Sequence, residues 1–409
     1  MAEKRELRQA VGNWVAGETF FDRESELAAF MELLEEGANV LLVAARRTGK
    51  TSLMREAALH LGEQMASVFV DLEGSETPED AIVAIGAATH SHQGLFRRTL
   101  EFFRNAVPPE LKLDELTLRL RDEVRGDWRA KGDRLLALLA RDERPVVIFL
   151  DEVPILVNRL VCDPRGELRP EGRAAADGFM SWLRSAAQRH QGKLRFVLSG
   201  SIGLGPVLRR VGLSATLNGF TPFVLEPWPD DVAQRCLLAL ARNYGVDLAG
   251  GAAGAMTARL GCCIPHHVQL FFSHVRDDAR RRATHVVTPI DADRVYDERL
   301  LGNRGHAMLS HYEERLRQVL DPSHRDLAAD LLTEAAVTGR LVSPAAIALA
   351  AEHVAGDSGA ALDEVLGVLE HDGYIAREGA SYVFVSKLVR DWWRARFGFR
   401  WTPVVERPR

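Results

Sequence analysis

A short loop that ends in a lysine and a threonine is the first feature of this sequence that could do chemistry. The run AARRTGKT (residues 44–51) follows an apolar, strand-like segment and precedes a helix-like one, SLMREAALHL. This is the context of a Walker A loop, whose backbone N–H groups surround a phosphate at a helix N-terminus. Lys50 would contact the β- and γ-phosphates, the Thr51 hydroxyl would bind magnesium, and Gly49 would let the backbone approach the phosphate.

The loop departs from the usual GxxxxGK[ST] pattern at its first position, where Ala44 replaces glycine. A methyl group there is harmless if the backbone φ is negative, and this is what we expect. The nucleotide-contacting residues predicted from the loop are Ala45, Arg46, Arg47, Thr48, Gly49, Lys50, Thr51 and Ser52.

A pair of acids follows a second apolar run, PVVIFLDE (residues 145–152). Two carboxylates at the end of a buried strand are costly unless they have a purpose. In a Walker B strand Asp151 would hold magnesium and Glu152 would polarise the attacking water as general base. The alternative is a strand end that reaches solvent and carries two ordinary surface acids.

A third apolar run, RFVLSGS, ends in Ser199 and Ser201. A hydroxyl there would bond the γ-phosphate or the lytic water, as a sensor residue does, unless the segment is a plain turn. The predicted catalytic residues are therefore Lys50, Glu152, Ser199 and Ser201. Four arginines are candidates for stabilising transition-state charge or are simply solvated, namely Arg46, Arg47, Arg209 and Arg210.

Apolar, β-rich segments separated by helical periodicity must position these residues. Strands are expected at residues 39–44, 67–72, 145–151, 194–199 and 223–225. Their near-continuous Val, Ile, Leu and Phe indicate burial on both faces, which is typical of a parallel sheet between helices. The expected fold class is α/β, a doubly wound P-loop core, with a helical insertion at about residues 75–144 whose helices span 78–107 and 114–141.

Helical patterns dominate after the strands end. We expect a core over residues 1–228, an all-helical lid domain over 229–320 and a third domain over 321–409. The third domain shows helices at 325–338, 344–354 and 360–371, then a hairpin-like run, DGYIAREGASYVFVS, and a last helix at 387–397. Three helices followed by a hairpin is winged-helix order.

The bulk composition describes an ordinary folded protein. The chain has 409 residues, 46% of them hydrophobic, and a formal net charge of -5, which gives no global attraction to polyanions. The four cysteines show no metal-ligand spacing and are expected to be reduced thiols. The N-terminus has no apolar leader and no run reaches the roughly 18 apolar residues of a membrane span, so we expect a cytoplasmic protein with no membrane partner.

Several motifs in a fixed order together resemble the archaeal-type ATPase family. They are FFDRESEL (residues 20–27), the loop AARRTGKTSL, VFVDLEG, FLDEVPIL and SGSIGL. That family belongs to the STAND branch of P-loop ATPases, is related to AAA+ and origin-recognition proteins, and often carries a winged helix. The resemblance covers roughly residues 20–272. It implies ATP and Mg²⁺ as cofactors.

The resemblance also implies residues that contact the base. Phe21 and Arg23 would lie beside the adenine, and Pro265 in the lid motif GCCIPHH would lie near the base. This sequence departs from the family at Asp22, which replaces a common glycine, and in the longer spacing between Gly261 and Pro265. The adjacent histidines, 266 and 267, would either sense phosphate or pack and cap a helix.

The charge of the expected recognition helix distinguishes a DNA-binding function from a nucleotide-dependent switch. Residues 360–371 (AALDEVLGVLEH) carry three acids and no Lys or Arg, and phosphates would repel them. Basic residues instead alternate with tryptophans in the last helix, a pattern that suits nucleic acid or an amphipathic helix packed on its domain. We therefore expect an ATP/ADP-dependent switch that hydrolyses slowly and acts on a protein partner or by self-association. The alternatives are a DNA-handling AAA+-like ATPase and a nucleotide-binding scaffold without turnover.

Overall fold

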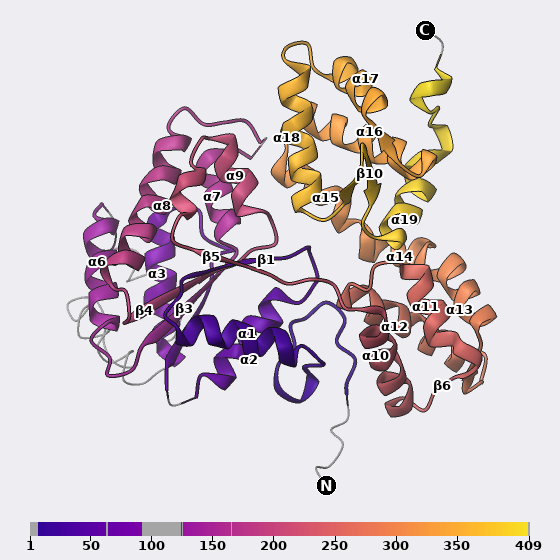
Figure 1. Cartoon of the computed structure of the whole chain (residues 1–409), viewed down its shortest axis with the longest axis horizontal. Helices are drawn as coiled ribbons and strands as arrows, with labels where there is room; N and C mark the ends of the chain where they lie inside the picture. Colours follow the sequence, from indigo (N-terminus) through magenta and orange to yellow (C-terminus); the bar gives the residue numbers. More distant parts are fainter. Residues whose placement is uncertain (1–6, 63, 92–123, 125, 165, 408–409) are drawn as a thin grey trace. The chain divides into compact units, whose positions relative to one another are not determined.

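The computed structural model describes residues 7–62, 64–91, 124, 126–164 and 166–407 (Figure 1). The chain forms two compact units. One contains Arg23–Val43 and Leu53–Leu225, and the other contains Met1–Asp22, Ala44–Ser52 and Glu226–Arg409. The division into three domains at residues 228 and 320 stays a prediction.

A five-stranded parallel sheet is the centre of the first unit. Its strands are β1 (Val40–Val43), β2 (Ala66–Asp71), β3 (Val146–Asp151), β4 (Leu194–Leu198) and β5 (Thr221–Val224). They lie in the order β2-β3-β4-β1-β5. The strands lie within a few residues of the predicted ones, and the prediction of an α/β fold with a parallel sheet is confirmed.

Burial on both faces was predicted for every strand and holds only in the middle of the sheet. All residues of β3 and β4 are buried, whereas β5 exposes Thr221, Pro222 and Val224. The prediction is wrong for β5 because this strand lies at the edge of the sheet and pairs only with β1. A proline is tolerated there because an edge strand has unpaired backbone groups on one side.

Helices connect the strands and cover the sheet (Figure 1). They are α1 (Glu24–Glu35), α2 (Lys50–His60), α3 (Pro78–Ala88), α6 (Trp128–Leu139), α7 (Val153–Val161), α8 (Gly172–Arg189) and α9 (Leu204–Arg210). Helices α3 and α6 lie within the predicted insertion, and α3 packs on the edge strand β2. The rest of the predicted helices 78–107 and 114–141 falls largely on residues 92–123, outside the described residues.

The second unit is mostly helical over the predicted lid. Its helices are α10 (Asp230–Asn243), α11 (Ala252–Leu260), α12 (Pro265–Arg281), α13 (Pro289–Val295), a π-helical turn at Tyr296–Leu300, α14 (Asn303–Leu309) and α15 (His311–Val319). Two two-residue strands, β6 (Asp247–Leu248) and β7 (Val286–Val287), pair in parallel. The segment is therefore not all-helical, because this short pair joins the loops that follow α10 and α12.

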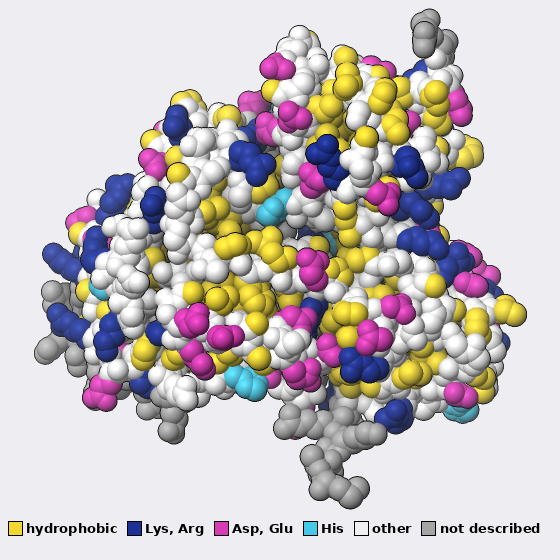
Figure 2. All heavy atoms as spheres, in the orientation of Figure 1, with side chains coloured by type: hydrophobic (Ala, Val, Ile, Leu, Met, Phe, Trp, Pro, Cys, Tyr) yellow, Lys and Arg dark blue, Asp and Glu magenta, His cyan; other side chains and the backbone are white. Residues whose placement is uncertain are grey.

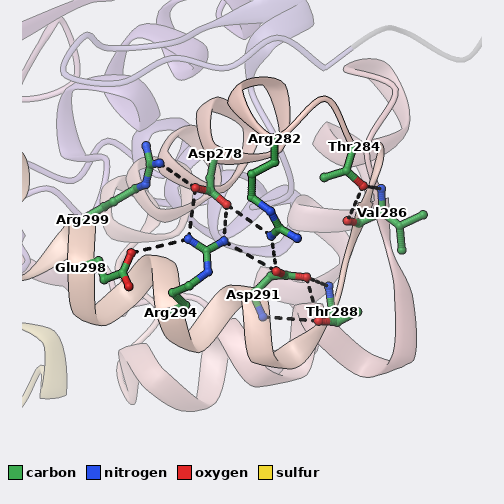
Figure 3. Close-up of polar contacts among 9 residues, drawn as sticks. All are labelled: Asp278, Arg282, Thr284, Val286, Thr288, Asp291, Arg294, Glu298 and Arg299. Carbon is green, nitrogen blue, oxygen red and sulfur yellow. Dashed lines mark hydrogen bonds and ion pairs between the residues drawn. The ribbon is translucent and has the colours of Figure 1, made fainter.

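A cluster of ion pairs fastens α12 to α13 and the π-helical turn (Figure 3). The Asp278 carboxylate is nearly fully buried and pairs with Arg282, Arg294 and Arg299. Asp291 accepts from the Thr288 hydroxyl at 2.8 Å and also pairs with Arg282. Each acid is therefore held by several donors, and the helices of this segment are cross-linked by charge.

The C-terminal part follows the predicted order of elements. It comprises α16 (Pro322–Thr338), β8 (Leu341–Val342), α17 (Ser343–His353), α18 (Ser358–His371), β9 (Ile375–Glu378), β10 (Ser381–Phe384) and α19 (Lys387–Phe397). The strands form a small antiparallel sheet in the order β8-β10-β9. Strand β8 was not predicted, since two residues give no periodicity to read.

Candidate nucleotide site

The predicted phosphate loop joins β1 to α2. Gly49 has φ +104°, a conformation that favours glycine, and Lys50 is the first residue of α2. Ala44 is not among the residues with positive φ, so its methyl group is compatible with the backbone, as expected. Arg47 has φ 65°. A left-handed residue and a left-handed glycine within three positions produce the tight turn that a loop around an anion needs.

Lys50 is folded against its own loop. Its Nζ donates to the carbonyl oxygens of Ala44 at 2.9 Å and Ala45 at 3.1 Å. The Thr48 hydroxyl donates to the same Ala45 oxygen at 2.7 Å, and the Ser52 hydroxyl accepts from the backbone N–H of Val15 at 3.0 Å. The loop side chains therefore bond the loop itself and the N-terminal segment. A phosphate that recruits Lys50 has to replace two carbonyl bonds.

Arg46 and Arg47 interact electrostatically with α12 and α15. Burial lowers the pKa of Arg47, the charge of Arg46 lowers it further, and Tyr312 opposes the shift. Both arginines in turn help to depress the pKa of His311, which burial lowers to about 3. The sequence predicts that these arginines contact phosphate. In the structure they interact with the His311 ring and the Tyr312 phenol.

Three buried histidines lie near Arg47, namely His266 and His267 of α12 and His311 of α15. Burial lowers the pKa of His267 to about 3 and that of His266 well below its usual range, with Arg47 adding to both shifts. His267 Nε2 lies 3.3 Å from the Tyr312 hydroxyl, and His311 Nδ1 lies 2.8 Å from the Met308 carbonyl oxygen. Burial, together with the positive charges of Arg46 and Arg47, keeps these histidines neutral at pH 7.

The Walker B acids lie at the carboxyl end of β3. Asp151 is only 6% exposed. Glu152 has φ 59° and precedes the first residue of α7. Its Oε2 accepts from the Ser201 N–H at 2.8 Å and from the Ser201 hydroxyl at 2.9 Å. The turn that follows β4 is therefore in direct contact with Glu152, the candidate general base.

Ser199 and Ser201 differ in their surroundings. Ser199 is buried, and its hydroxyl has no hydrogen-bond partner among the described residues. The hydroxyl of Ser201 is bound to Glu152 rather than directed to a free position. A side chain at Gly200 between them would lie 2.4 Å from Pro154, so this turn requires glycine.

Sequence reasoning missed two charged residues at this edge of the sheet. Asp71 ends β2 and is the register partner of Asp151. Arg55 of α2 places its guanidinium 3.4 Å from the centre of the Phe69 ring, two residues before Asp71. The run VFVDL shows the same signal as PVVIFLD, an apolar strand that ends in an acid, and so Asp71 was within reach of the sequence.

The oxygen donors in these elements fit magnesium. Carboxylate and hydroxyl oxygens are ligands that Mg²⁺ prefers, and it usually keeps several waters besides one or two protein ligands. Asp151 and the Thr51 hydroxyl would hold it there, and the ion would supply positive charge to the phosphates. Over the described ranges no group of three or more His, Cys, Asp or Glu could form a complete metal cage.

The residues predicted beside the base lie in different surroundings. Phe21 packs edge-on against the Trp228 ring with ring centres 5.7 Å apart, and the backbone N–H of Trp228 donates to the Cys263 carbonyl oxygen at 3.0 Å. Pro265 is the first residue of α12. Trp228 thus links Phe21 to the lid motif, and the sequence prediction did not include it.

The remaining predicted residues are engaged elsewhere. Asp22 has φ 57°, which lies in the left-handed region that favours glycine and that aspartate adopts occasionally. Arg23 pairs with Glu26. Arg210 donates to Cys162 Sγ at 3.3 Å and to the Gly166 carbonyl oxygen at 3.2 Å, so it braces the segment after α7.

Comparisons with known proteins agree with this fold. Residues 19–192 match the model of the AAA ATPase domain family. The Walker-type ATPase of Pyrococcus abyssi is 19% identical, with 93% of this chain and 98% of that chain covered and a TM-score of 0.62. The Aeropyrum pernix ORC2 protein, solved as ADPNP-ADP complexes, is 12% identical, with 93% and 98% covered and a TM-score of 0.52. A search of curated proteins returns no match.

At these identities the structural likenesses establish the fold, and the family match covers the segment that contains the loop, β2, β3 and the Asp151–Glu152 pair. No helix in the described part of the chain is long and apolar enough to cross a membrane. The similarity to the AAA ATPase domain family extends over residues 19–192 of this chain.

Proposed function

We propose that this protein is a slow ATP hydrolase that works as a nucleotide-dependent switch, with a lid (229–320) and a winged helix (321–409) that respond to the state of the phosphate loop. The observation that carries this proposal is the packing of the loop on the C-terminal part. A methyl group at Gly373, between α18 and β9, would lie 2.8 Å from the Ala45 Cβ. The predicted phosphate loop, at Ala45, is thus in van der Waals contact with the turn at Gly373, whose position we expect to depend on the bound nucleotide.

The arginines of the loop support the same proposal. Arg46 and Arg47 interact with Tyr312, and the Tyr374 hydroxyl donates to the Tyr312 carbonyl oxygen at 2.6 Å. Tyr374 directly follows Gly373. A rearrangement of the loop around phosphate would therefore change the contacts of both α15 and the turn before β9. A ligand that favours one loop conformation would shift the positions of both elements.

The proposed chemistry assigns a role to each predicted site residue. Lys50 would leave the Ala44 and Ala45 carbonyls for the phosphates, and Glu152 would take a proton from the attacking water. Ser201 fixes the Glu152 carboxylate with two donors, and Ser199 offers a buried hydroxyl to the γ-phosphate or the water. Thr51 and Asp151 would hold the magnesium ion.

A DNA-handling role finds less support in the C-terminal part. The exposed side chains of α18 include Asp363 and Glu370. In α19 the two tryptophans, 392 and 393, are buried, and the N–H of Trp401 donates to Glu334. The rings of Trp392 and Trp393 therefore pack within the domain and are not free to stack on bases. Basic and acidic side chains are also interspersed over the face drawn in Figure 2.

The first experiment measures ATP turnover with magnesium, with and without duplex DNA, for the wild type, Lys50→Ala and Glu152→Gln. We expect each substitution to lower kcat by roughly a hundredfold or more, because each removes a group that acts on the phosphates or the water. DNA should leave turnover unchanged. Stimulation by DNA would favour the DNA-handling ATPase, and turnover that survives both substitutions would refute the site assignment.

The second experiment tests the switch. Gly373→Ala should push the C-terminal part away from the loop and accelerate release of a fluorescent ADP analogue by roughly tenfold, the scale of a typical coupling free energy. Gly379→Ala is the matched control, because Gly379 also has a positive φ but a methyl group there has open space. Equal release rates in the two variants would show that the contact does not report the nucleotide state.

A further inference from the structure

Two carboxylates stand side by side at the carboxyl edge of the sheet. Strands β2 and β3 pair in parallel with Asp71 opposite Asp151 and Phe69 opposite Phe149. Register partners on neighbouring strands lie about 4.8 Å apart and project to the same face. The Phe69 and Phe149 rings confirm this, since they stack with centres 6.0 Å apart. Because alternate residues of a strand share a face, Asp71 and Asp151 lie on the face of these two rings.

Helix α2 brings one cation to this face. The Arg55 guanidinium lies over the Phe69 ring, 3.4 Å from its centre, and Asp71 is the next residue of β2 on that face. Burial lowers the pKa of Arg55, and the charges of Asp151 and Asp71 oppose that shift. Arg55 also lies one helical turn after Thr51, so the two side chains share one side of α2.

Adjacent carboxylates repel each other, and a nearby cation relieves that repulsion, most of all for the buried Asp151. We propose that Arg55 is the resident counter-cation of the Asp71–Asp151 pair, and that the divalent ion accompanying a nucleotide competes with it for these carboxylates. Asp71 is then a second acidic residue of the metal site. This inference rests on the proposed function, because it takes Asp151 as the residue that receives the ion.

The competition has a consequence for how nucleotide binds. With Arg55 in place the net charge of the group falls from −2 to −1 before any metal arrives, so nucleotide binding depends less on magnesium. Without Arg55 the uncompensated carboxylates repel the phosphates, and binding depends on the divalent ion. The quantity to measure is the magnesium factor, defined as the ratio of the Kd of a fluorescent ADP analogue in EDTA to its Kd in saturating magnesium.

Arg55→Met keeps an unbranched apolar side chain over Phe69 and removes the charge. We expect it to raise the magnesium factor about tenfold, the effect of one nearby charge in a partly buried site. Asp71→Asn should lower the factor severalfold, and its Oδ1 can still accept the Glu73 N–H that Asp71 accepts at 2.8 Å. The double variant should return toward the wild-type factor, since the two charges act on each other.

Arg55→Lys is the control for packing, because it keeps the charge and loses the flat guanidinium over the ring. Its magnesium factor should stay within about twofold of the wild type. If Arg55→Lys and Arg55→Met shift the factor equally, or if Arg55→Met leaves it unchanged, Arg55 is a packing residue and the inference is wrong. Failure of the proposed function looks different, because the wild type would then bind no nucleotide analogue in either condition.

Discussion

At the scale of single residues, the candidate general base, Glu152, is held by Ser201, a residue that was expected to contact the γ-phosphate or the attacking water. Glu152 adopts a left-handed backbone conformation and its carboxylate receives both donors of Ser201. A non-glycine residue keeps such a backbone only where its surroundings determine it, and such positions cluster at functional sites. We therefore predict that Ser201 is a positioning residue that acts through Glu152.

Replacing Ser201 with alanine removes the hydroxyl donor and keeps the N–H donor. We predict that Ser201→Ala lowers kcat roughly tenfold, the effect of losing one hydrogen bond to a charged group, with KM nearly unchanged. Steady-state kinetics over a range of ATP concentrations checks this. Ser201→Thr, which restores the hydroxyl, should recover most of the loss. A rise in KM at constant kcat would instead place Ser201 in substrate binding.

At the scale of elements, the lid segment depends on one buried acid. Burial raises the pKa of Asp278 of α12, but its partners Arg294, Arg299 and Arg282 hold it below its ordinary value (Figure 3). The Thr288 backbone N–H, with the Thr288 hydroxyl and Arg282, lowers the pKa of Asp291 to about 2. Removing one member of a buried ion cluster leaves the others uncompensated. The cluster therefore fixes α12 against α13.

Asp278→Asn should lower the free energy of unfolding by about 3 kcal/mol, as expected for breaking a buried charge cluster. Glu298→Gln removes an exposed acid of the same cluster and should change stability by less than about 0.5 kcal/mol. Chemical denaturation followed by circular dichroism measures both. Comparable losses in the two variants would mean that burial of Asp278 is not what makes the cluster important.

The elements also show what a sequence can predict. Strands β1 to β4 and helices α16 to α19 were found from periodicity because their apolar residues repeat over four or more positions. Strands β6, β7 and β8 have two residues each and leave no such pattern. Within the site, Lys50, Asp151 and Glu152 stand out by motif, and Asp71 shares the signal of an apolar strand that ends in an acid. Arg55 and Trp228 become visible only through ring contacts that join distant parts of the sequence.

At the scale of the whole molecule, acid should destabilise the protein well before its carboxylates are protonated. His267 and His311 have pKa values of about 3 in the folded protein, against 6.5 when unfolded, and the pKa of His266 is also lowered. The unfolded chain therefore binds more protons below pH 6.5, so stability is full above that pH and falls as pH decreases toward 3. Asp278 and Asp291 add a further loss only below about pH 3.8.

Thermal unfolding between pH 8 and pH 5 checks this expectation. The melting temperature should be flat from pH 8 to 7 and fall toward pH 5, where His267 alone contributes a loss of about 2 kcal/mol. His267→Gln removes that titration and should flatten the profile, even if it lowers stability at pH 7. A wild-type profile that is level down to pH 5 would show that the histidines are not held neutral.

The proline in β5 has a consequence for how copies of the molecule meet. Strand β5 is the last strand of the sheet, and Pro222 has no N–H to offer on its outer side. A second chain cannot extend the sheet across a strand whose ladder of donors is broken at that point. Pro222 therefore protects the exposed edge of the sheet at β5 against edge-to-edge stacking into fibres.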